Sequence, residues 1–277
     1  MADQKVAVVT GATSGIGQYI ALGLARAGFC TVLVARSTAR AEAAQRWIAE
    51  RAVGAVTELM LADLSSLEAT RSIGRAIAAR HPRIDVLVNN AGLITAKREV
   101  TAEGHEVILA VNHLSPFVLT EALEPALKMA APARVVNVGS AASDRVRIDL
   151  DDLEGQQKWR ATTAYGRSKL AIMMATFDRA RRLHGSGVAV NVVHPGVVAT
   201  RFGEIKGPIG LAWRLGAPFM LTPEQGVDTP LHVALSPQVE GVTGRYFKRR
   251  KEARPNTQAL DPALVGRLWA ETVRLVA

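Results

Sequence analysis

The sequence has little of several features that mark other classes of protein. Its one cysteine, Cys30, excludes an intramolecular disulfide framework and a cysteine-based zinc site, and we expect it to be a small buried residue. Only 5% of the residues are aromatic, too few for a platform on which nucleic-acid bases stack. We find no run of eighteen apolar residues and no signal peptide. We therefore expect a soluble cytoplasmic protein that binds no nucleic acid.

Acidic residues are also fewer than basic ones, 25 against 34, which leaves a formal net charge of +9. The densest basic run is "KRRKEAR", Lys248 to Arg254, and the other arginines are scattered through helical segments. We interpret the excess as a solvated basic face that helps anionic ligands to approach.

Short apolar runs alternate with longer segments that carry apolar residues at helical spacing, as expected for strands separated by helices. Continuously apolar strands of this kind indicate a parallel sheet covered on both faces. We find no linker or internal repeat, so we predict one α/β domain over 1–277, a doubly wound Rossmann-type fold with a parallel seven-stranded sheet. The expected strands are 5–10, 30–35, 56–61, 84–89, 133–139, 188–193 and 243–247.

Two segments break this alternation, 141–161 and about 200–225, and both follow the carboxyl ends of expected strands, where open α/β sheets bind ligands. We expect them to form the walls and lid of a substrate site. The second segment carries large apolar residues that favour an apolar or aromatic substrate: Leu211, Trp213, Leu215, Phe219 and Met220. A peripheral membrane contact through the same segment is the alternative.

A glycine-rich turn follows the first expected strand directly, in "TGATSGIGQYI". Gly11, Gly15 and Gly17 permit a tight turn, and without a Cβ the backbone can approach a pyrophosphate at the start of the next helix. The spacing is G-x-x-x-G-x-G, and a generic glycine turn is the other interpretation of this stretch alone.

A second pattern, "YGRSK", places Tyr165 and Lys169 one helical turn apart on the same face. A phenol and an amine titrate near 10 and 10.4, so neither is a good acid or base near neutrality by itself. A nearby ammonium group would favour phenolate and lower the tyrosine pKa. The pair is therefore either a proton-transfer device or a chance spacing on a helix.

Seven motifs in order resolve this choice, because together they resemble the short-chain dehydrogenase/reductase family over nearly the whole chain. They are "TGATSGIG", "ADLSS", "NNAG" at 89–92, "AVNHLSPF", "NVGS", "YGRSK" and "HPGVVAT". Within that family the chain most resembles retinol-dehydrogenase-like reductases, in "VNHLSPFVLT", the "DLDDLEGQQKW" insert and the "ALDPALVGRLWAET" ending.

The resemblance implies an oxidoreductase that transfers a hydride between a nicotinamide cofactor and a carbonyl or alcohol. Tyr165 would be the acid/base, Ser140 would orient the substrate oxygen, Lys169 would lower the tyrosine pKa and bind the nicotinamide ribose, and Asn112 would hold a water. The implied cofactor-binding residues, besides Tyr165 and Lys169, are Gly11, Thr13, Ser14, Gly15, Ile16, Gly17, Arg36, Ser37, Arg40, Asp63, Leu64, Asn90, Ala91, Gly92, Pro195, Gly196, Val197 and Thr200.

The end of the second expected strand favours NADP(H) over NAD(H). NAD enzymes commonly place an acidic residue there for the ribose 2′-hydroxyl, but this chain has Ala35 followed by Arg36. Arg36 can form a charge-assisted contact with a 2′-phosphate, and Arg40 follows one turn into the next helix.

Other interpretations stay open at this point. A non-catalytic dinucleotide sensor is one alternative, and a sugar-nucleotide epimerase or dehydratase is another, although such relatives usually have G-x-x-G-x-x-G spacing. We assign structural hydrogen bonds to His113 and His194. We expect the acidic loop residues Asp149, Asp151, Asp152 and Glu154 to be solvated and assign no metal. A homo-oligomer through the long central helices is also expected of many relatives.

Overall fold

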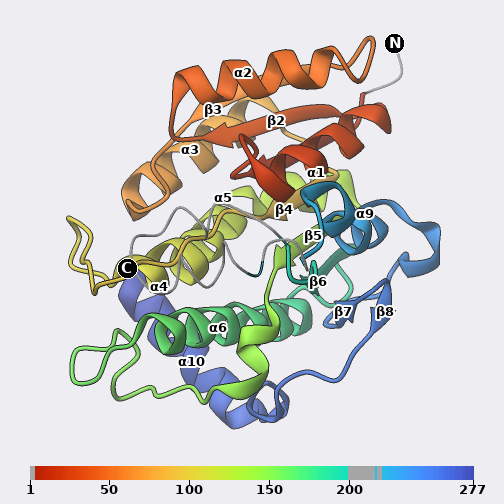
Figure 1. Cartoon of the computed structure of the whole chain (residues 1–277). Coiled ribbons are helices and arrows are strands. Elements are labelled where there is room, and N and C mark those ends of the chain that lie inside the picture. Colours follow the sequence, from red (N-terminus) through yellow and green to blue (C-terminus); the bar gives the residue numbers. More distant parts are fainter. Residues whose placement is uncertain (1–3, 199–215, 217–219) are drawn as a thin grey trace.

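The computed structural model describes residues 4–198, 216 and 220–277 (Figure 1). One sheet runs through it, with strand order β3-β2-β1-β4-β5-β6-β7-β8. The strands are β1 (Val6–Thr10), β2 (Cys30–Ala35), β3 (Thr57–Leu61), β4 (Val86–Asn89), β5 (Ala133–Val138), β6 (Val188–His194), β7 (Tyr246–Lys248) and β8 (Lys251–Glu252). The order reverses between β1 and β4, which creates the crevice where doubly wound folds bind ligands.

The predicted Rossmann-type sheet is confirmed, with one difference in strand number. The first seven strands pair in parallel, but β8 pairs antiparallel with β7. Arg249 and Arg250 have φ values of 49° and 62°, the left-handed backbone that a two-residue hairpin needs. The basic run Lys248–Arg254 therefore folds back on β7 as a hairpin, which strand periodicity alone did not indicate.

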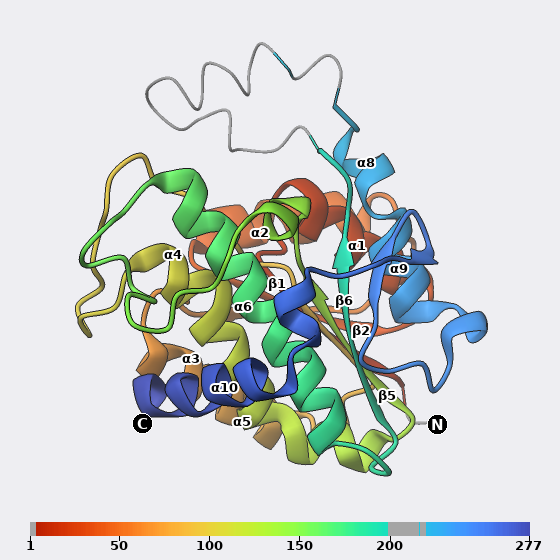
Figure 2. The same cartoon turned by 90° about the horizontal axis from the view of Figure 1, so that it is seen from below.

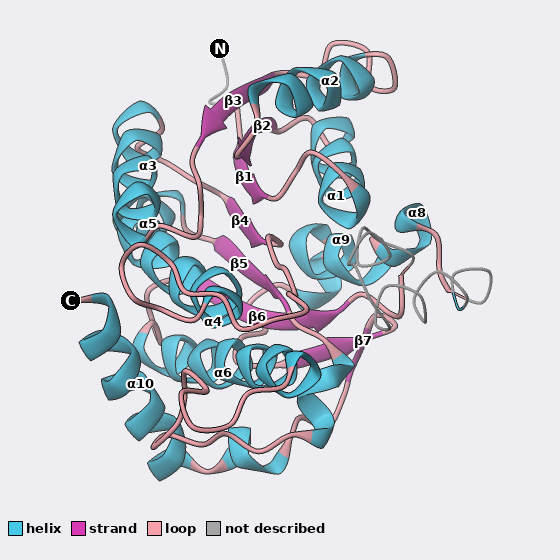
Figure 3. Ribbon diagram, turned by 60° about the vertical axis from the view of Figure 1, so that its left-hand side comes forward, coloured by secondary structure: helices cyan, strands magenta, loops and turns pink. Residues whose placement is uncertain are grey.

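Helices cover both faces of the sheet (Figure 3). Helices α1 (Gly15–Arg26), α2 (Thr38–Ala49) and α9 (Asp228–Leu235) share one apolar cluster on one face. Helices α3 (Leu67–Arg80), α5 (Ser115–Ala130) and α6 (Ala161–Arg182) lie on the other. The central strands β1, β2 and β4 are buried along their whole length, because helices exclude water from both sides.

The long segment with helical spacing before β5 is divided into three helical parts. It consists of α4 (Val107–Leu109), a π-helical turn (Ala110–Leu114) and α5. By length and mean hydropathy (1.2) alone, Val107–Ala130 qualifies as a membrane span. However, 78% of the most apolar part of this stretch is buried inside the protein, so we assign the stretch to the core.

A last helix, α10 (Pro262–Val276), was not among the elements expected from the sequence. It begins at the N-cap Asp261, whose carboxylate accepts hydrogen bonds from the backbone N–H groups of Ala263 and Leu264. Leu268 and Val276 are buried in the cluster that α6 shares, and Figure 2 shows α10 alongside α6 and α5. The short helix α8 (Pro223–Gly226) precedes α9.

Candidate active site

The four candidate catalytic residues come from three elements that meet at the carboxyl ends of the central strands. Ser140 follows β5 and is the N-cap of a short 3₁₀ helix, Ala141–Arg145. Asn112 lies in the π-helical turn, and Tyr165 and Lys169 lie on the first turns of α6. The sequence separates these residues by up to 57 positions, and the parallel sheet brings their elements to one edge.

The side chains of Tyr165 and Ser140 lie close enough to interact, and this interaction favours the phenolate. Part of the tyrosine is accessible to solvent, but burial raises the pKa of its phenol to about 12, and the interaction with Ser140 opposes this rise only in part. The phenol is therefore protonated at neutral pH, which is the form that can donate a proton to an oxyanion.

Lys169 lies behind the tyrosine and is almost entirely buried. Its Nζ donates to the carbonyl of Val138 at the end of β5 (2.8 Å) and lies 5.9 Å from the Tyr165 ring centroid. Burial lowers the pKa of Lys169 to about 8. Its side chain thus lies close to the ring, as the four-residue spacing predicts, but in the cofactor-free chain burial, not the lysine charge, dominates the tyrosine pKa.

Asn112 is 1% exposed, and both ends of its side-chain amide are bonded to protein groups. Oδ1 accepts from the Leu93 N–H (2.8 Å), while Nδ2 donates to the Leu93 carbonyl and to Ser168 Oγ, both at 3.0 Å. A Cβ on Gly92 would lie 3.2 Å from Asn112 Oδ1 and 3.3 Å from Lys169 Nζ. Gly92 is therefore the point where the "NNAG" loop and these two side chains converge.

The glycine turn after β1 has the geometry that a dinucleotide needs. Gly11 and Gly15 have φ values of +65° and +54°, and Gly15 opens α1 after the N-cap Ser14. A Cβ on Gly17 would lie 2.3 Å from both Asn90 Nδ2 and Gly11 O, so only glycine fits there. Thr13, Ser14, Gly15 and Ile16 are partly exposed, which leaves the helix start open to a phosphate group.

The "NNAG" loop is tied to this turn by a set of hydrogen bonds. Thr10 Oγ1 accepts from the backbone N–H groups of Asn90 and Ala91, both at 3.0 Å. Asn90 Nδ2 donates to the carbonyls of Thr10 (3.0 Å) and Gly11 (3.3 Å). The glycine turn after β1 and the "NNAG" loop after β4 are thus bonded to each other at the point where the strand order reverses.

The end of β2 presents basic side chains to solvent. Arg36 and Arg40 are exposed, and Arg36 lies 3.9 Å from the Asp63 carboxylate in a loose, solvent-exposed pair. Ser37 is the N-cap of α2, and Leu64 is partly buried beside Asp63. No acidic residue stands at the end of β2, so the edge that would face a 2′-phosphate carries positive charge.

The motif after β6 closes the site on its other side. Pro195 is partly buried, Gly196 has φ +97°, and Val197 is 53% exposed. A Cβ on Gly196 would lie 2.5 Å from Leu221 Cδ1, so the last part of the expected lid lies against this turn. Thr200 and the expected lid residues Leu211, Trp213, Leu215 and Phe219 lie outside the described residues.

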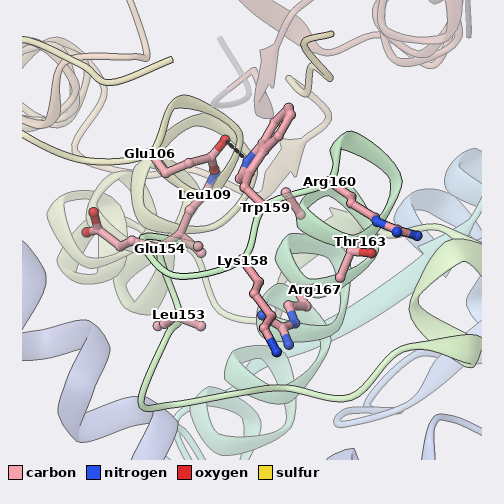
Figure 4. Close-up of a pocket in the computed structure, with 11 residues that line it drawn as sticks. Glu106, Leu109, Leu153, Glu154, Lys158, Trp159, Arg160, Thr163 and Arg167 are labelled. Carbon is pink, nitrogen blue, oxygen red and sulfur yellow. Dashed lines mark hydrogen bonds between the residues drawn. The ribbon is translucent and has the colours of Figure 1, made fainter. Parts of the chain in front are cut away.

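The small pocket in Figure 4 is not the candidate active site, because none of the four candidate residues lines it. By helical spacing, the α6 residues that line it, Thr163 and Arg167, lie on the opposite face of that helix from Tyr165 and Lys169. Glu106 is buried at its edge, where it accepts from Trp159 Nε1 (3.1 Å) and from the Leu109 N–H (2.8 Å). The pocket thus shows how segment 141–161 is pinned to the start of α4.

The expectation of a solvated acidic loop is wrong for two of its four members. Asp152 is 8% exposed and accepts from three successive backbone N–H groups, those of residues 156–158, which lower its carboxyl pKa although burial opposes them. Glu154 pairs with His105 at 2.8 Å. Asp149 forms a loose pair with Arg167, and Asp151 is exposed, as expected.

The two histidines differ from each other. His113 makes the expected structural bond, from Nε2 to Thr272 Oγ1 at 2.8 Å, and burial lowers its pKa to about 3. Burial lowers the pKa of His194 to about 4. Its Nδ1, like that of His113, finds no hydrogen-bond partner among the residues that the structure describes. Neither is a useful base near neutrality.

One cluster within the described ranges meets the distance criterion for a metal ion. Ligand atoms of Cys30, Glu58 and His81 lie within 4.8 Å of one another at the edge opposite the candidate active site. Arg80 already binds the Glu58 carboxylate at 2.5 Å, and the Cys30 thiol donates to its other oxygen at 3.8 Å. The carboxylate is thus neutralised by protein groups. Cys30 is buried, as predicted.

Three contributors to the site were not found by the motif analysis. Ser168 lies inside "YGRSK" and could have been suspected, because it shares a helix face with Tyr165. Thr10 ends β1 and could have been noted as a strand-end hydroxyl. The Val138 carbonyl that holds Lys169 is a backbone group and leaves no signal in the sequence.

This fold and this site define a nicotinamide-type oxidoreductase, and the comparisons with known proteins agree. The short chain dehydrogenase family model matches residues 5–207. Human retinol dehydrogenase 13 is 38% identical over 279 residues, which cover 98% of this chain and 84% of that protein.

Solved structures lead to the same family. A crystal structure of an uncharacterised protein from Mycobacterium paratuberculosis matches with a TM-score of 0.80 at 28% identity, over 99% of this chain and 93% of that one. Pseudomonas aeruginosa RhlG, solved as an NADP active-site complex, matches with a TM-score of 0.69 at 30% identity, over 88% and 93%. The chain belongs to the short-chain dehydrogenase family, and it is a hydride-transferring oxidoreductase.

Proposed function

We propose that this protein uses NADP(H) to interconvert an apolar carbonyl compound and its alcohol, with Tyr165 as the acid/base. The observation that carries the proposal is that Tyr165, with Ser140 close to its phenol, lies beside buried Lys169 at the carboxyl edge of the sheet. Reduction of a carbonyl leaves an alkoxide that needs a positioned proton donor, and this pair supplies one.

The residues present fit a dinucleotide. The turn at Gly11–Gly17 leaves no space for a side chain at Gly17 and opens onto the start of α1, where a pyrophosphate would bind. Arg36, with Arg40 nearby, would hold the 2′-phosphate, and the relative RhlG was solved with NADP. The bound nicotinamide supplies or accepts the hydride.

The chain's own residues would handle the proton. Ser140 would donate to the substrate oxygen and orient it toward the Tyr165 phenol. Lys169, which donates to the Val138 carbonyl, would bind the nicotinamide ribose. Asn112, which accepts from the Leu93 N–H, would fix the loop beside the lysine and hold a water. A phenol pKa of about 12 keeps the tyrosine protonated at neutral pH, the form that would donate a proton to the alkoxide when a carbonyl is reduced.

The proposed substrate class is based on a similar protein whose substrate is named and on the apolar residues of the expected lid. Human retinol dehydrogenase 13 is the relative quoted above, and its named substrate is an apolar alcohol. The apolar residues between 211 and 220 support a long apolar carbonyl compound rather than a sugar. We therefore propose retinal and similar apolar aldehydes as the first substrates to test.

The test is a panel of carbonyl substrates followed by NADPH absorbance, with the product's stereochemistry determined. Retinal, an aromatic aldehyde, a short aliphatic ketone and a keto-sugar would be compared, with NADH run in parallel. We expect turnover of the apolar carbonyls with NADPH. Tight NADPH binding without turnover of any carbonyl would instead favour a dinucleotide sensor, and epimerisation of a sugar nucleotide would favour that alternative class.

We also propose that the enzyme works in the cytoplasm. A peripheral membrane contact through residues 200–225 is the alternative to a lid, and most of that segment lies outside the described residues. Support comes from the burial of the Val107–Ala130 stretch in the core. Cell fractionation with and without a high-salt wash tests this, and material released only by detergent would contradict it. A homo-oligomer remains an expectation, for which light scattering of the purified protein is the measurement.

A further inference from the structure

Two of the candidate catalytic residues lie on turns that are not α-helical. Ser140 caps the 3₁₀ helix Ala141–Arg145, and Asn112 is the middle residue of the π-helical turn Ala110–Leu114. Such turns have weaker internal hydrogen-bond geometry than an α-helix and commonly depend on outside contacts. The contacts that each turn makes with the rest of the chain therefore decide where Ser140 and Asn112 point.

The Ser140 turn is held by Asn256, a residue 116 positions further along the chain. Asn256 is 9% exposed, and its Nδ2 donates to the carbonyls of Ser143 (2.8 Å) and Val146 (2.9 Å). Ser143 in turn donates from its N–H (3.1 Å) and its Oγ (2.6 Å) to the Ser140 carbonyl. Asn256 is thus two hydrogen bonds away from Ser140, which lies beside Tyr165.

The Asn112 turn is held by Thr272 on α10. Thr272 is fully buried, and its hydroxyl donates to the Leu268 carbonyl one turn earlier (2.8 Å). With that proton committed, Thr272 Oγ1 can only accept from Nε2 of His113 (2.8 Å), the neighbour of Asn112. This bond fixes His113 as the neutral Nε2–H tautomer and ties the π-helical turn to α10.

We call Asn256 and Thr272 the two braces. Both belong to the part of the chain after residue 207, beyond the range that the family model matches. We infer that Asn256 and Thr272 are positioning residues: the C-terminal segment 246–277 holds the Ser140 and Asn112 turns from behind. The inference rests on the proposed function for its effect on turnover. Its structural part, the hold on the two turns, can be measured without any substrate.

The substrate-independent test is residue-resolved amide hydrogen exchange. The Leu93 N–H is bonded to Asn112 Oδ1, and the Ala142 N–H is bonded to Ser140 Oγ, so each amide reports on one side chain. We expect Thr272→Val to speed exchange at Leu93 about tenfold or more and Asn256→Ala to do so at Ala142. Exchange at both amides unchanged from wild type would overturn the inference, whatever the enzyme's activity.

The chain offers a matched control for Thr272. Thr176 is also buried, its hydroxyl also donates to the carbonyl four residues earlier, that of Ile172 (2.7 Å), and it also accepts from a buried side chain, Asn137 Nδ2 (2.8 Å). Thr176→Val should lower stability by a similar amount yet leave the Leu93 amide and kcat unchanged. Thr272→Ser keeps the hydroxyl and should restore both. Equal effects of the two valine variants on kcat would mean that Thr272 acts only through stability.

Kinetics in a double-mutant cycle connects the braces to catalysis. With NADPH saturating, we expect Thr272→Val and Asn256→Ala each to lower kcat about tenfold, with NADPH affinity unchanged. In an Asn112→Ala background, Thr272→Val should have almost no further effect on kcat, and the same should hold for Asn256→Ala in Ser140→Ala. If each double variant lost kcat by the product of its two single effects, the positioning role would be contradicted. If wild type turns over no carbonyl while the two amides respond, the proposed function fails and the braces stand.

Discussion

The two ends of the candidate cofactor site are built in opposite ways. At the catalytic end, Lys169 and Asn112 are almost fully buried, and their polar atoms are bonded to protein groups at 2.8–3.0 Å. At the other end, the Arg36 side chain is 73% exposed, and among the described residues its one ion pair is the 3.9 Å contact with Asp63. Burial shifts pKa values and fixes geometry at the first, whereas solvent screens charge at the second. Substitutions should therefore affect chemistry at one end and cofactor choice at the other.

The largest effect is expected for Tyr165→Phe, which removes one oxygen and little volume. Loss of the proton donor should lower kcat by roughly 10²–10⁴, with folding and NADPH affinity nearly unchanged. Steady-state turnover on the best carbonyl, with NADPH binding by fluorescence titration, checks both parts. Near-normal turnover by this variant would refute the assigned mechanism.

Lys169→Met should reduce kcat/KM by about 10² and, unlike the tyrosine variant, should also weaken NADPH binding, because the lysine has two roles. The wild-type pH profile tests the same charge. Burial lowers the Lys169 pKa to about 8, so its positive charge is present below that pH and is lost as the pH rises through it. We expect NADPH affinity to fall above about pH 8 in wild type only. A profile shared by the variant would assign the pH dependence to another group.

At the exposed end, Arg36→Asp should collapse the preference for NADPH by about 2–3 kcal/mol in kcat/KM, since it removes a phosphate partner and adds a repulsive charge. Raising the ionic strength should weaken the wild-type preference, as expected for a screened contact. The matched control is Arg40→Asp, for which a smaller change is expected. A wild type that prefers NADH would show that the end of β2 does not select the 2′-phosphate.

The smallest effect is expected for Asp63→Asn. The Arg36–Asp63 pair is exposed and long, so its loss should change the free energy of unfolding by less than about 1 kcal/mol. Urea denaturation measures this, and Asp152→Asn is the contrast, because that carboxylate is buried and accepts three backbone N–H groups. Equal losses from the two substitutions would show that exposure does not separate these carboxylates.

The same contrast explains what the sequence could and could not predict. The sheet, the glycine turn and the Tyr165–Lys169 face follow from local patterns, because periodicity and residue type carry them. The π-helical turn was hidden, since apolar spacing continues through it without a break. The direction of the Tyr165 pKa shift also could not be predicted, because it depends on how much of the chain buries the phenol. Asn256 and Thr272 contact partners more than a hundred positions away, and no local motif announces such contacts.

The hairpin and α10 also bear on the order in which the protein can become active. A chain emerging from the ribosome exposes its N-terminal part first, so β1, the glycine turn and the "NNAG" loop are all made long before residues 256 and 272. The glycine turn and the "NNAG" loop are bonded to each other through Thr10 and Asn90 and need no later segment for these bonds. The turns that carry Ser140 and Asn112, in contrast, are held by Asn256 and Thr272, which are synthesised near the end of the chain. A nascent chain should thus acquire its nucleotide-binding half before it can perform chemistry.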